Sequence, residues 1–163
     1  MVEFAMIAPI FFLLLFAVIQ LGLLFGAQNG LVNAVRDSTR RAATYRINEA
    51  SFDGGFTIAG ICQTIRTEID GRLRQMPGFV AANRTATIRY EWKSNNDTPE
   101  TYFVVAHINV QYRHPLYVPL VNIFLDGVDG TDDGALMLEA SEQMRVENPD
   151  ILNSGTDQSC PNP

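Results

Sequence analysis

Cysteine and histidine are scarce in this chain, with two of each among 163 residues. Two cysteines cannot form a zinc site of four thiolates, and Cys62 and Cys160 are too far apart for a C-x-x-C redox pair. His107 and His114 are seven positions apart, an odd separation that places them on opposite faces of a regular strand. We therefore expect neither a shared metal site nor a redox pair from these residues.

Motifs of familiar active sites are also missing. The sequence contains no G-x-S-x-G elbow, no glycine-rich phosphate loop, no H-E-x-x-H helix and no G-x-G-x-x-G turn. We therefore expect a protein that is not an enzyme and that binds no cofactor. A secreted enzyme with an uncleaved anchor stays open as an alternative, because motif searches do not detect new kinds of active site.

Positive charge is limited: 12 Lys and Arg stand against 18 Asp and Glu, which gives a net charge of −6. The arginines are scattered, whereas binding to a phosphate backbone needs a clustered basic surface, so nucleic acid is not an expected partner. Asp126, Asp129, Asp132 and Asp133 could attract calcium. Their spacing differs from that of an EF-hand, and a solvated acidic loop is the favoured interpretation.

Only one long run of the sequence is both apolar and free of charge, and it covers residues 4–27. As a helix it would be about 36 Å long, enough to cross a hydrocarbon core of about 30 Å. The chain is therefore expected to cross a membrane once. A cleavable signal peptide is the less favoured alternative, because its apolar core would be shorter and would follow positive charge, whereas the first charge here is Glu3.

The helical pattern continues past the apolar run without a breaker. We therefore expect one helix over residues 1–46, with a membrane span of about 4–27 and an extramembrane extension. Small residues recur at every fourth position along it: Gly22, Gly26, Gly30, Ala34, Ser38 and Ala42. Such a ridge lets a second helix approach closely in lipid, and its first four members are the candidate packing face. A helix that is merely rich in glycine is the alternative.

Residues 47–163 are expected to form an α+β domain with a flexible C-terminal tail. Apolar residues at helical spacing predict an amphipathic helix over residues 58–76, which a Pro-Gly pair ends. A period of two predicts three strands, at residues 85–92, 101–113 and 136–146. An antiparallel sheet of three or four strands with one apolar face needs a cover, and the two helices can supply it.

The most apolar segment of the domain is residues 116–125, which carry no charge. Long connections usually pack against something, so we interpret the segment as a loop or short helix that covers the core. The alternative is an exposed patch for a partner or for the membrane surface, formed by Leu116, Tyr117, Leu120 and Phe124.

Two features bear on the compartment that holds the domain. Cys62 and Cys160 could form a disulfide in an oxidising compartment, or they could be a buried helix cysteine and an unrelated tail cysteine. The charge rule for membrane helices points the other way, because four arginines follow the span and would place that side in the cytoplasm: Arg36, Arg40, Arg41 and Arg46. These patterns leave the orientation open.

Residues 2–9, Val-Glu-Phe-Ala-Met-Ile-Ala-Pro, and the Phe/Leu-rich stretch that follows to Gly26 resemble the N-terminal signature of TadE-like pseudopilins. These are minor pilin-like proteins of bacterial tight-adherence (Flp-type) pili. Residues 36–43 look like the end of the family's helix, and residues 144–149 look like its C-terminal strand. The resemblance covers both ends of the chain and implies a pilin-like fold.

The resemblance implies a subunit that acts in pilus assembly. In the family, a prepilin peptidase removes a short basic leader just ahead of this motif, and a glutamate near the new N-terminus serves subunit recognition; the matching residue is Glu3. The implied partners are other pilin or pseudopilin subunits, inner-membrane assembly proteins, the prepilin peptidase and the lipid bilayer. The implied location is the bacterial inner membrane, with one span and a periplasmic domain, or the extracellular pilus itself.

A membrane-tethered periplasmic binding or sensor module is the alternative function. In that case the first helix is only a tether and would tolerate replacement by an unrelated membrane span. Glu3 would then be an interfacial carboxylate that complements the positive end of the helix dipole.

Overall fold

The computed structural model describes residues 2–45, 58–96, 98, 100–118, 130, 133–147 and 157–160. The elements in these residues are α1 (Val2–Thr44), α3 (Ile58–Leu73), the short 3-10 helix η1 (Ala81–Asn83), β1 (Arg84–Ser94), β2 (Tyr102–Pro115), β3 (Ala135–Arg145) and β4 (Gln158–Ser159). The expected α+β fold, with a long N-terminal helix, a second helix and an antiparallel sheet, is confirmed.

The four strands form one antiparallel sheet in the order β3-β2-β1-β4. In the β1–β2 hairpin, Arg84 opposes Tyr112 and Ser94 opposes Tyr102. The three predicted strands agree with the structure to within two residues at each end, because burial alternates along them as the period of two requires. The fourth strand is β4, which comes from the end of the chain and pairs with Arg89 and Tyr90.

α3 ends three residues earlier than the sequence pattern predicts, at Leu73 rather than Met76. Pro77 is the physical reason, since proline has no N–H to continue a helix and disfavours the α conformation in the residue before it. The chain instead tightens into turns, and the N–H of Met76 donates to the carbonyl of Leu73 over 2.9 Å. Gly78 then redirects the chain toward β1 with a φ of 68°.

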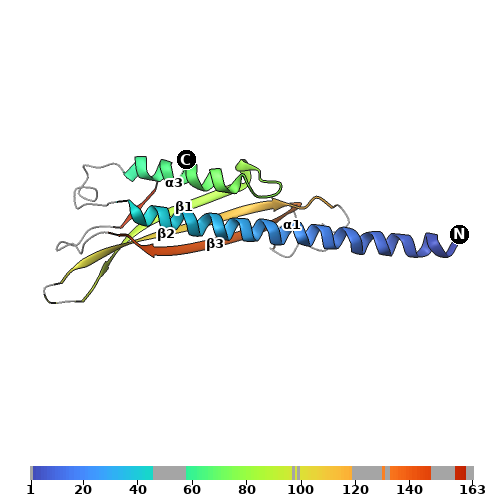
Figure 1. Cartoon of the computed structure of the whole chain (residues 1–163), viewed down its shortest axis with the longest axis horizontal. Coiled ribbons are helices and arrows are strands. Elements are labelled where there is room, and N and C mark those ends of the chain that lie inside the picture. Colours follow the sequence, from blue (N-terminus) through green and yellow to red (C-terminus); the bar gives the residue numbers. More distant parts are fainter. Residues whose placement is uncertain are drawn as a thin grey trace.

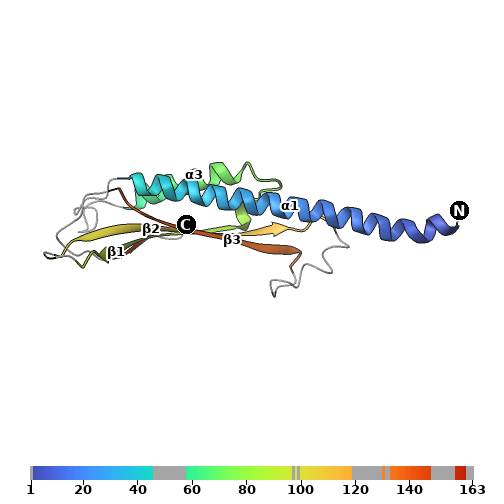
Figure 2. The same cartoon turned by 60° about the horizontal axis from the view of Figure 1, so that its bottom comes forward.

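α1 and α3 lie side by side on one face of the sheet, and the core fills the space between the helices and the strands (Figure 2). Both helices and the sheet contribute fully buried side chains to this core, which include Leu31, Val35, Ile65, Ile69, Ile88, Tyr90, Ile108 and Tyr112. The even-numbered residues of the three long strands therefore face the helices, as the sequence pattern predicts.

α1 has two parts with different surroundings. Its first part, up to residue 19, protrudes from the end of the sheet, and its second part, from Gln20 on, packs against the sheet and α3 (Figure 1). Within the described residues, α1 is the helix that is long and apolar enough to cross a membrane. The domain therefore covers the C-terminal third of the apolar run that the sequence assigns to the membrane.

Candidate functional site: the protruding helix and its junction with the domain

The protruding part of α1 presents an apolar surface that no described residue of the domain covers. Its large side chains are exposed over most of the helix circumference, among them Phe4, Met6, Ile7, Ile10, Phe11, Leu14 and Val18. An apolar surface of this extent is stable only in lipid or against other apolar helices. This part of α1 is therefore the region of the molecule best suited to membrane insertion and to helix packing.

Glu3 lies in the first turn of α1 and is exposed. Its carboxylate complements the positive end of the helix dipole, but it makes no ion pair with any residue that the structure describes. A charge at the edge of an apolar helix needs the membrane interface or a cation from another molecule. The structure leaves both arrangements open to Glu3.

The ridge of small residues on α1 divides into a free part and a packed part. A Cβ on Gly22 would meet no atom within 4 Å, and one on Gly26 would be 3.9 Å from Pro77 Cγ. A Cβ on Gly30, in contrast, would be 2.7 Å from Met76 Cγ. Ala34 is buried within the same chain, as are the next two members of the ridge, Ser38 and Ala42. Gly22 and Gly26 therefore form the part of the ridge that another helix can reach.

The junction is the contact between α1 at Gln20 and the end of β2. Gln20 interrupts the apolar run, yet its side chain is fully buried because the domain covers it. The backbone N–H of Tyr117 donates to Gln20 Oε1 over 3.1 Å, although the two residues are 97 apart in the sequence. The single amide in a long apolar run was the sequence signal for this contact, since a buried polar group needs a hydrogen-bond partner.

Two tyrosines hold the turn after α3 at the same junction. The hydroxyl groups of Tyr112 and Tyr117 both donate to the carbonyl oxygen of Gly78 over 3.1 Å, and the N–H of Val80 donates to the Tyr112 hydroxyl over 2.9 Å. A Cβ on Gly78 would be 1.9 Å from the Tyr117 hydroxyl oxygen, so only glycine fits there. No sequence pattern predicted this arrangement, because it depends on the tertiary packing of β2 against the turn.

His114 is fully buried beside the junction, with its ring centroid 6.0 Å from that of Tyr112 and 5.9 Å from that of Tyr117. Neither of its ring nitrogens has a hydrogen-bond partner among the described residues. Burial lowers the pKa of His114, so its ring is neutral at pH 7. His107 lies on the other face of β2, 3.1 Å from Glu91, and the two histidines share no site.

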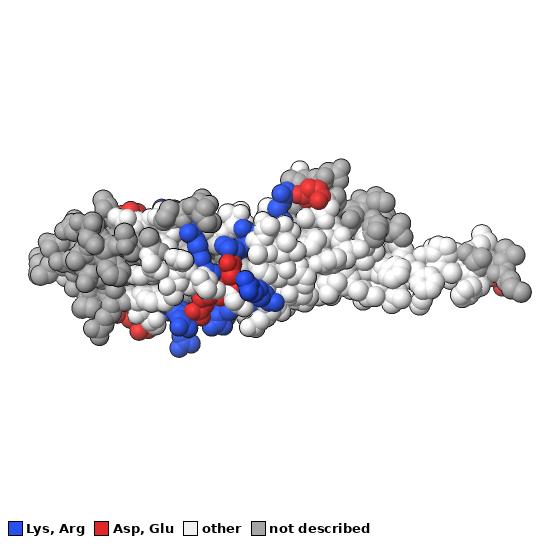
Figure 3. All heavy atoms as spheres, turned by 90° about the horizontal axis from the view of Figure 1, so that it is seen from above, with Lys and Arg blue, Asp and Glu red and all other residues white. Residues whose placement is uncertain are grey.

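Three ion pairs join the packed half of α1 to α3 and α3 to β1, and a fourth lies within α3. The carboxylate of Glu68 in α3 forms ion pairs with Arg41 of α1 and with Arg72 of its own helix. Arg72 also forms an ion pair with Asp37 of α1 over 2.6 Å. Asp70 of α3 forms an ion pair with Arg84 of β1 over 2.8 Å. Figure 3 shows basic and acidic side chains lying next to one another over the domain, while the protruding helix carries no Lys or Arg on the visible face. The charges that follow the span thus serve in part to dock α1 on the domain.

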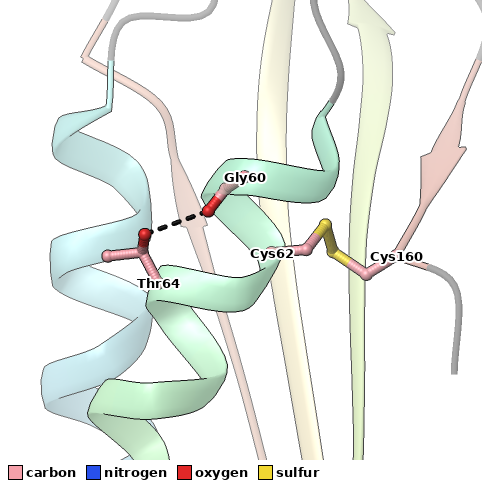
Figure 4. Close-up of a disulfide and its surroundings, with 4 residues drawn as sticks. All are labelled: Gly60, Cys62, Thr64 and Cys160. Carbon is pink, nitrogen blue, oxygen red and sulfur yellow. Dashed lines mark hydrogen bonds between the residues drawn. A yellow bond between two sulfur atoms is a disulfide. The ribbon is translucent and has the colours of Figure 1, made fainter. Parts of the chain in front are cut away.

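Cys62 of α3 and Cys160 are joined by a disulfide, with their Cα atoms 5.7 Å apart (Figure 4). Both cysteines are buried. The bond holds the short strand β4 at the edge of β1, where the N–H of Cys160 donates to the carbonyl of Ile88 over 2.9 Å. A second anchor is Asp157, whose carboxylate accepts the N–H of Trp92 over 2.9 Å.

The apolar segment after β2 is described only at its start. Leu116 is buried, as the interpretation of a core cover requires, whereas the Tyr117 side chain is half exposed. Leu120 and Phe124 lie outside the described residues, as do Asp126, Asp129 and Asp132. Asp133 forms an ion pair with Arg113. The described residues contain no group of three or more His, Cys, Asp or Glu side chains placed to hold a metal ion.

Comparison with known proteins supports the resemblance inferred from residues 2–9. The family model described as TadE-like protein matches residues 1–40, which include the whole protruding part of α1, both open glycines and Glu3. No curated protein and no solved structure matches the chain. The match covers about a quarter of the chain and falls on the described helix that is long and apolar enough to cross a membrane. Residues 1–40 of this chain are thus similar to the N-terminal segment of TadE-like proteins.

Proposed function

We propose that this protein is a non-enzymatic pilin-like subunit that acts in the assembly of a tight-adherence (Flp-type) pilus. One observation carries the proposal: the TadE-like match falls on the helix whose first half protrudes from the domain without cover from any described residue. A helix used only within its own chain would bury its apolar side chains there. This one keeps them available for lipid before assembly and for neighbouring helices afterwards.

Recognition between subunits would use two features of the protruding helix. The Glu3 carboxylate has no described partner in its own chain and would pair with a cation on a neighbouring subunit, where low polarity strengthens the attraction. Gly22 and Gly26 would let a neighbouring helix approach α1 closely, because neither is blocked by the domain. The partners would be pilin or pseudopilin subunits and inner-membrane assembly proteins, with a prepilin peptidase acting just ahead of the Glu3 motif.

The disulfide supports a periplasmic domain and a helix in the inner membrane. Disulfides persist in the periplasm and are rare in the reducing cytoplasm, so the Cys62–Cys160 bond favours export. The arginines after the span argue for the opposite orientation by charge alone. Arg41, however, is paired with Glu68 within the domain, which reduces the weight of that count.

The proposal is tested by two substitutions that leave the described fold unaffected. Glu3→Gln removes the charge and keeps the shape, and Gly22→Leu adds volume where the chain itself leaves open space. Matched controls are Glu100→Gln in the exposed loop between β1 and β2, and Gly71→Leu on the exposed side of α3, where a Cβ also meets open space.

We expect both test variants to accumulate in the membrane at the wild-type level and to lose surface pili and co-purified pilin subunits. The two control variants should retain surface pili and co-purified pilin subunits. Normal piliation in Glu3→Gln and Gly22→Leu together would refute the proposed role of the helix. Replacement of residues 4–19 by an unrelated membrane span provides an independent check, since a mere tether would survive it.

A further inference from the structure

One end of the domain carries an apolar surface that the assembly role does not explain. Outside α1, the described residues include three large apolar side chains that are strongly exposed: Val80 at 45%, Tyr117 at 50% and Met137 at 41%. We call these three residues the foot. They come from three separate segments, namely the turn before η1, the residues just after β2 and the start of β3.

All three foot residues lie at the end of the sheet from which α1 protrudes. Tyr117 contacts α1 directly through its hydrogen bond to Gln20, and Val80 is bonded to the Tyr112 hydroxyl in the neighbouring strand. Met137 opposes Arg113, close to the end of β2. The segments that carry these side chains thus lie at the end of the sheet from which α1 protrudes, with Tyr117 beside α1 and Met137 on the face of β3 that points away from the helices (Figure 1).

The length of the protruding helix fixes how far the foot lies from the membrane. Residues 2–19 span about 27 Å at the rise of an α-helix, slightly less than a hydrocarbon core of about 30 Å. Glu3, near the other end, is drawn to the opposite interface because a carboxylate is costly in lipid. The helix therefore has no spare length to hold the domain away from the bilayer.

The apolar surface of α1 also continues beside the domain. Past Gln20, the outward-facing side chains of Leu21 and Phe25 are still 42% and 68% exposed. Phe25 lies about 8 Å further along the helix than Gln20. These side chains carry the apolar surface of the helix past the level of Gln20, to which the foot residue Tyr117 is hydrogen-bonded. Gln20, the one amide at this level, is shielded from lipid because the domain buries it.

We propose that the foot is immersed in the headgroup region of the bilayer leaflet on the domain's side, so that the domain stands directly on the lipid surface. Tyrosine suits this position, because its ring packs in the apolar boundary while its hydroxyl stays hydrogen-bonded, here to Gly78. The buried Gln20–Tyr117 contact then makes the helix and the foot one rigid unit at the interface. This inference rests on membrane anchoring alone and does not depend on a role in pilus assembly.

The test uses the full chain reconstituted into phosphatidylcholine vesicles with bromine on the upper part of the acyl chains, which quenches nearby indole fluorescence. Trp92 is the one tryptophan of the chain and serves as the internal control. It lies about 26 Å along β1 from Arg84, at the far end of the hairpin. Reporters at the foot are Val80→Trp and, separately, Met137→Trp, each in a Trp92→Phe background; both sites are exposed, so the fold accepts the larger ring.

We expect the brominated lipid to quench each foot reporter several-fold more strongly than it quenches Trp92 in the wild-type chain. Quenching of both reporters only to the level of Trp92 would overturn the proposal, since the domain would then stand clear of the bilayer. Quenching at the level of Trp92 is also the result expected if the foot is a binding surface for a second protein and not for lipid. Pili are not needed for the measurement, so failure here is distinguishable from failure of the proposed function.

Discussion

Gly30 of α1 lies so close to Met76 that a Cβ on Gly30 would be 2.7 Å from Met76 Cγ and 3.2 Å from its Sδ. Real Cβ atoms do not approach other atoms so closely, and the glycine is therefore part of the packing between α1 and the turn after α3. The neighbouring ridge residues Gly22 and Gly26 are not restricted in this way. The small-residue ridge is uniform in sequence, but Gly30 packs within the chain, whereas Gly22 and Gly26 are available to another helix.

The first prediction compares glycines in the two helices. Gly30→Ala should lower the free energy of unfolding by about 1 kcal/mol, because the overpacking penalty of about 1–3 kcal/mol exceeds the gain in helix propensity. Gly71→Ala in α3 should raise it by about 0.5–1 kcal/mol, since a Cβ there meets open space. Urea unfolding in detergent checks both values. An equal gain in stability from both substitutions would contradict the packed contact at Met76.

The second prediction separates two buried tyrosines. Tyr112→Phe should destabilise the domain by about 1–2 kcal/mol, because the N–H of Val80 loses its acceptor. Tyr90→Phe should be neutral or slightly stabilising, because the buried Tyr90 hydroxyl has no hydrogen-bond partner among the described residues. Chemical unfolding of the two variants at pH 7 measures the difference. A larger loss from Tyr90→Phe than from Tyr112→Phe would contradict the described hydrogen bonds.

The third prediction concerns alkaline pH. Burial raises the pKa of both Tyr90 and Tyr112, whereas the unfolded chain titrates near the ordinary tyrosine value of about 10. The unfolded state therefore loses protons first, so the two tyrosines should leave stability unchanged between about pH 7 and pH 10 and lower it as the pH rises above 10. Tyr90→Phe should reduce this fall. An unchanged alkaline slope in the variant would show that Tyr90 ionises as freely in the folded state as in the unfolded one.

The fourth prediction is that the disulfide is a major source of stability. It closes a sequence separation of 98 residues, so its removal should cost about 2–5 kcal/mol. Cys62→Ala with Cys160→Ala should also release β4, which hydrogen exchange at the Cys160 position would report as lost protection of the backbone N–H that donates to Ile88. Intact mass with and without reductant establishes the bond itself. Two free thiols in protein exported to an oxidising compartment would contradict it.

The fifth prediction concerns acid pH and His114. Burial lowers the pKa of His114 in the folded state, while the unfolded chain binds a proton near pH 6.5. Stability should therefore fall as the pH drops below about 6.5 and continue to fall until the folded pKa is reached. His114→Phe should remove this loss between pH 7 and pH 5, and His107→Gln, on the other face of β2, should not. Equal slopes in the two variants would contradict the assignment.

Much of the fold was predictable because burial imposes a regular period on the sequence. The alternation from Ala86 to Tyr90 predicts one buried face of β1, and the absence of a breaker between residues 27 and 44 predicts one long α1. The end of α3 was misplaced by three residues because apolar side chains continue at helical spacing through the turn to Met76. Periodicity reports which side chains are buried and does not distinguish a last helical turn from a packed turn.

The candidate site was predictable only in part. Glu3 and the small-residue ridge are local patterns, and the family resemblance rests on contiguous residues. The division of the ridge at Gly30 depends on where Met76 packs, and the contact of Gln20 with Tyr117 joins residues 97 apart. Local sequence patterns carry no information on such long-range contacts, so these features required the three-dimensional structure.

The most direct test of the central claim is to purify the natively expressed protein from cross-linked membranes and from sheared surface filaments, with N-terminal sequencing of the recovered chain. We predict recovery together with pilin subunits in both fractions, with a processed N-terminus just ahead of Glu3. Recovery of the protein alone, unprocessed and confined to the membrane fraction, would contradict a role in pilus assembly and would leave α1 as a tether for the domain.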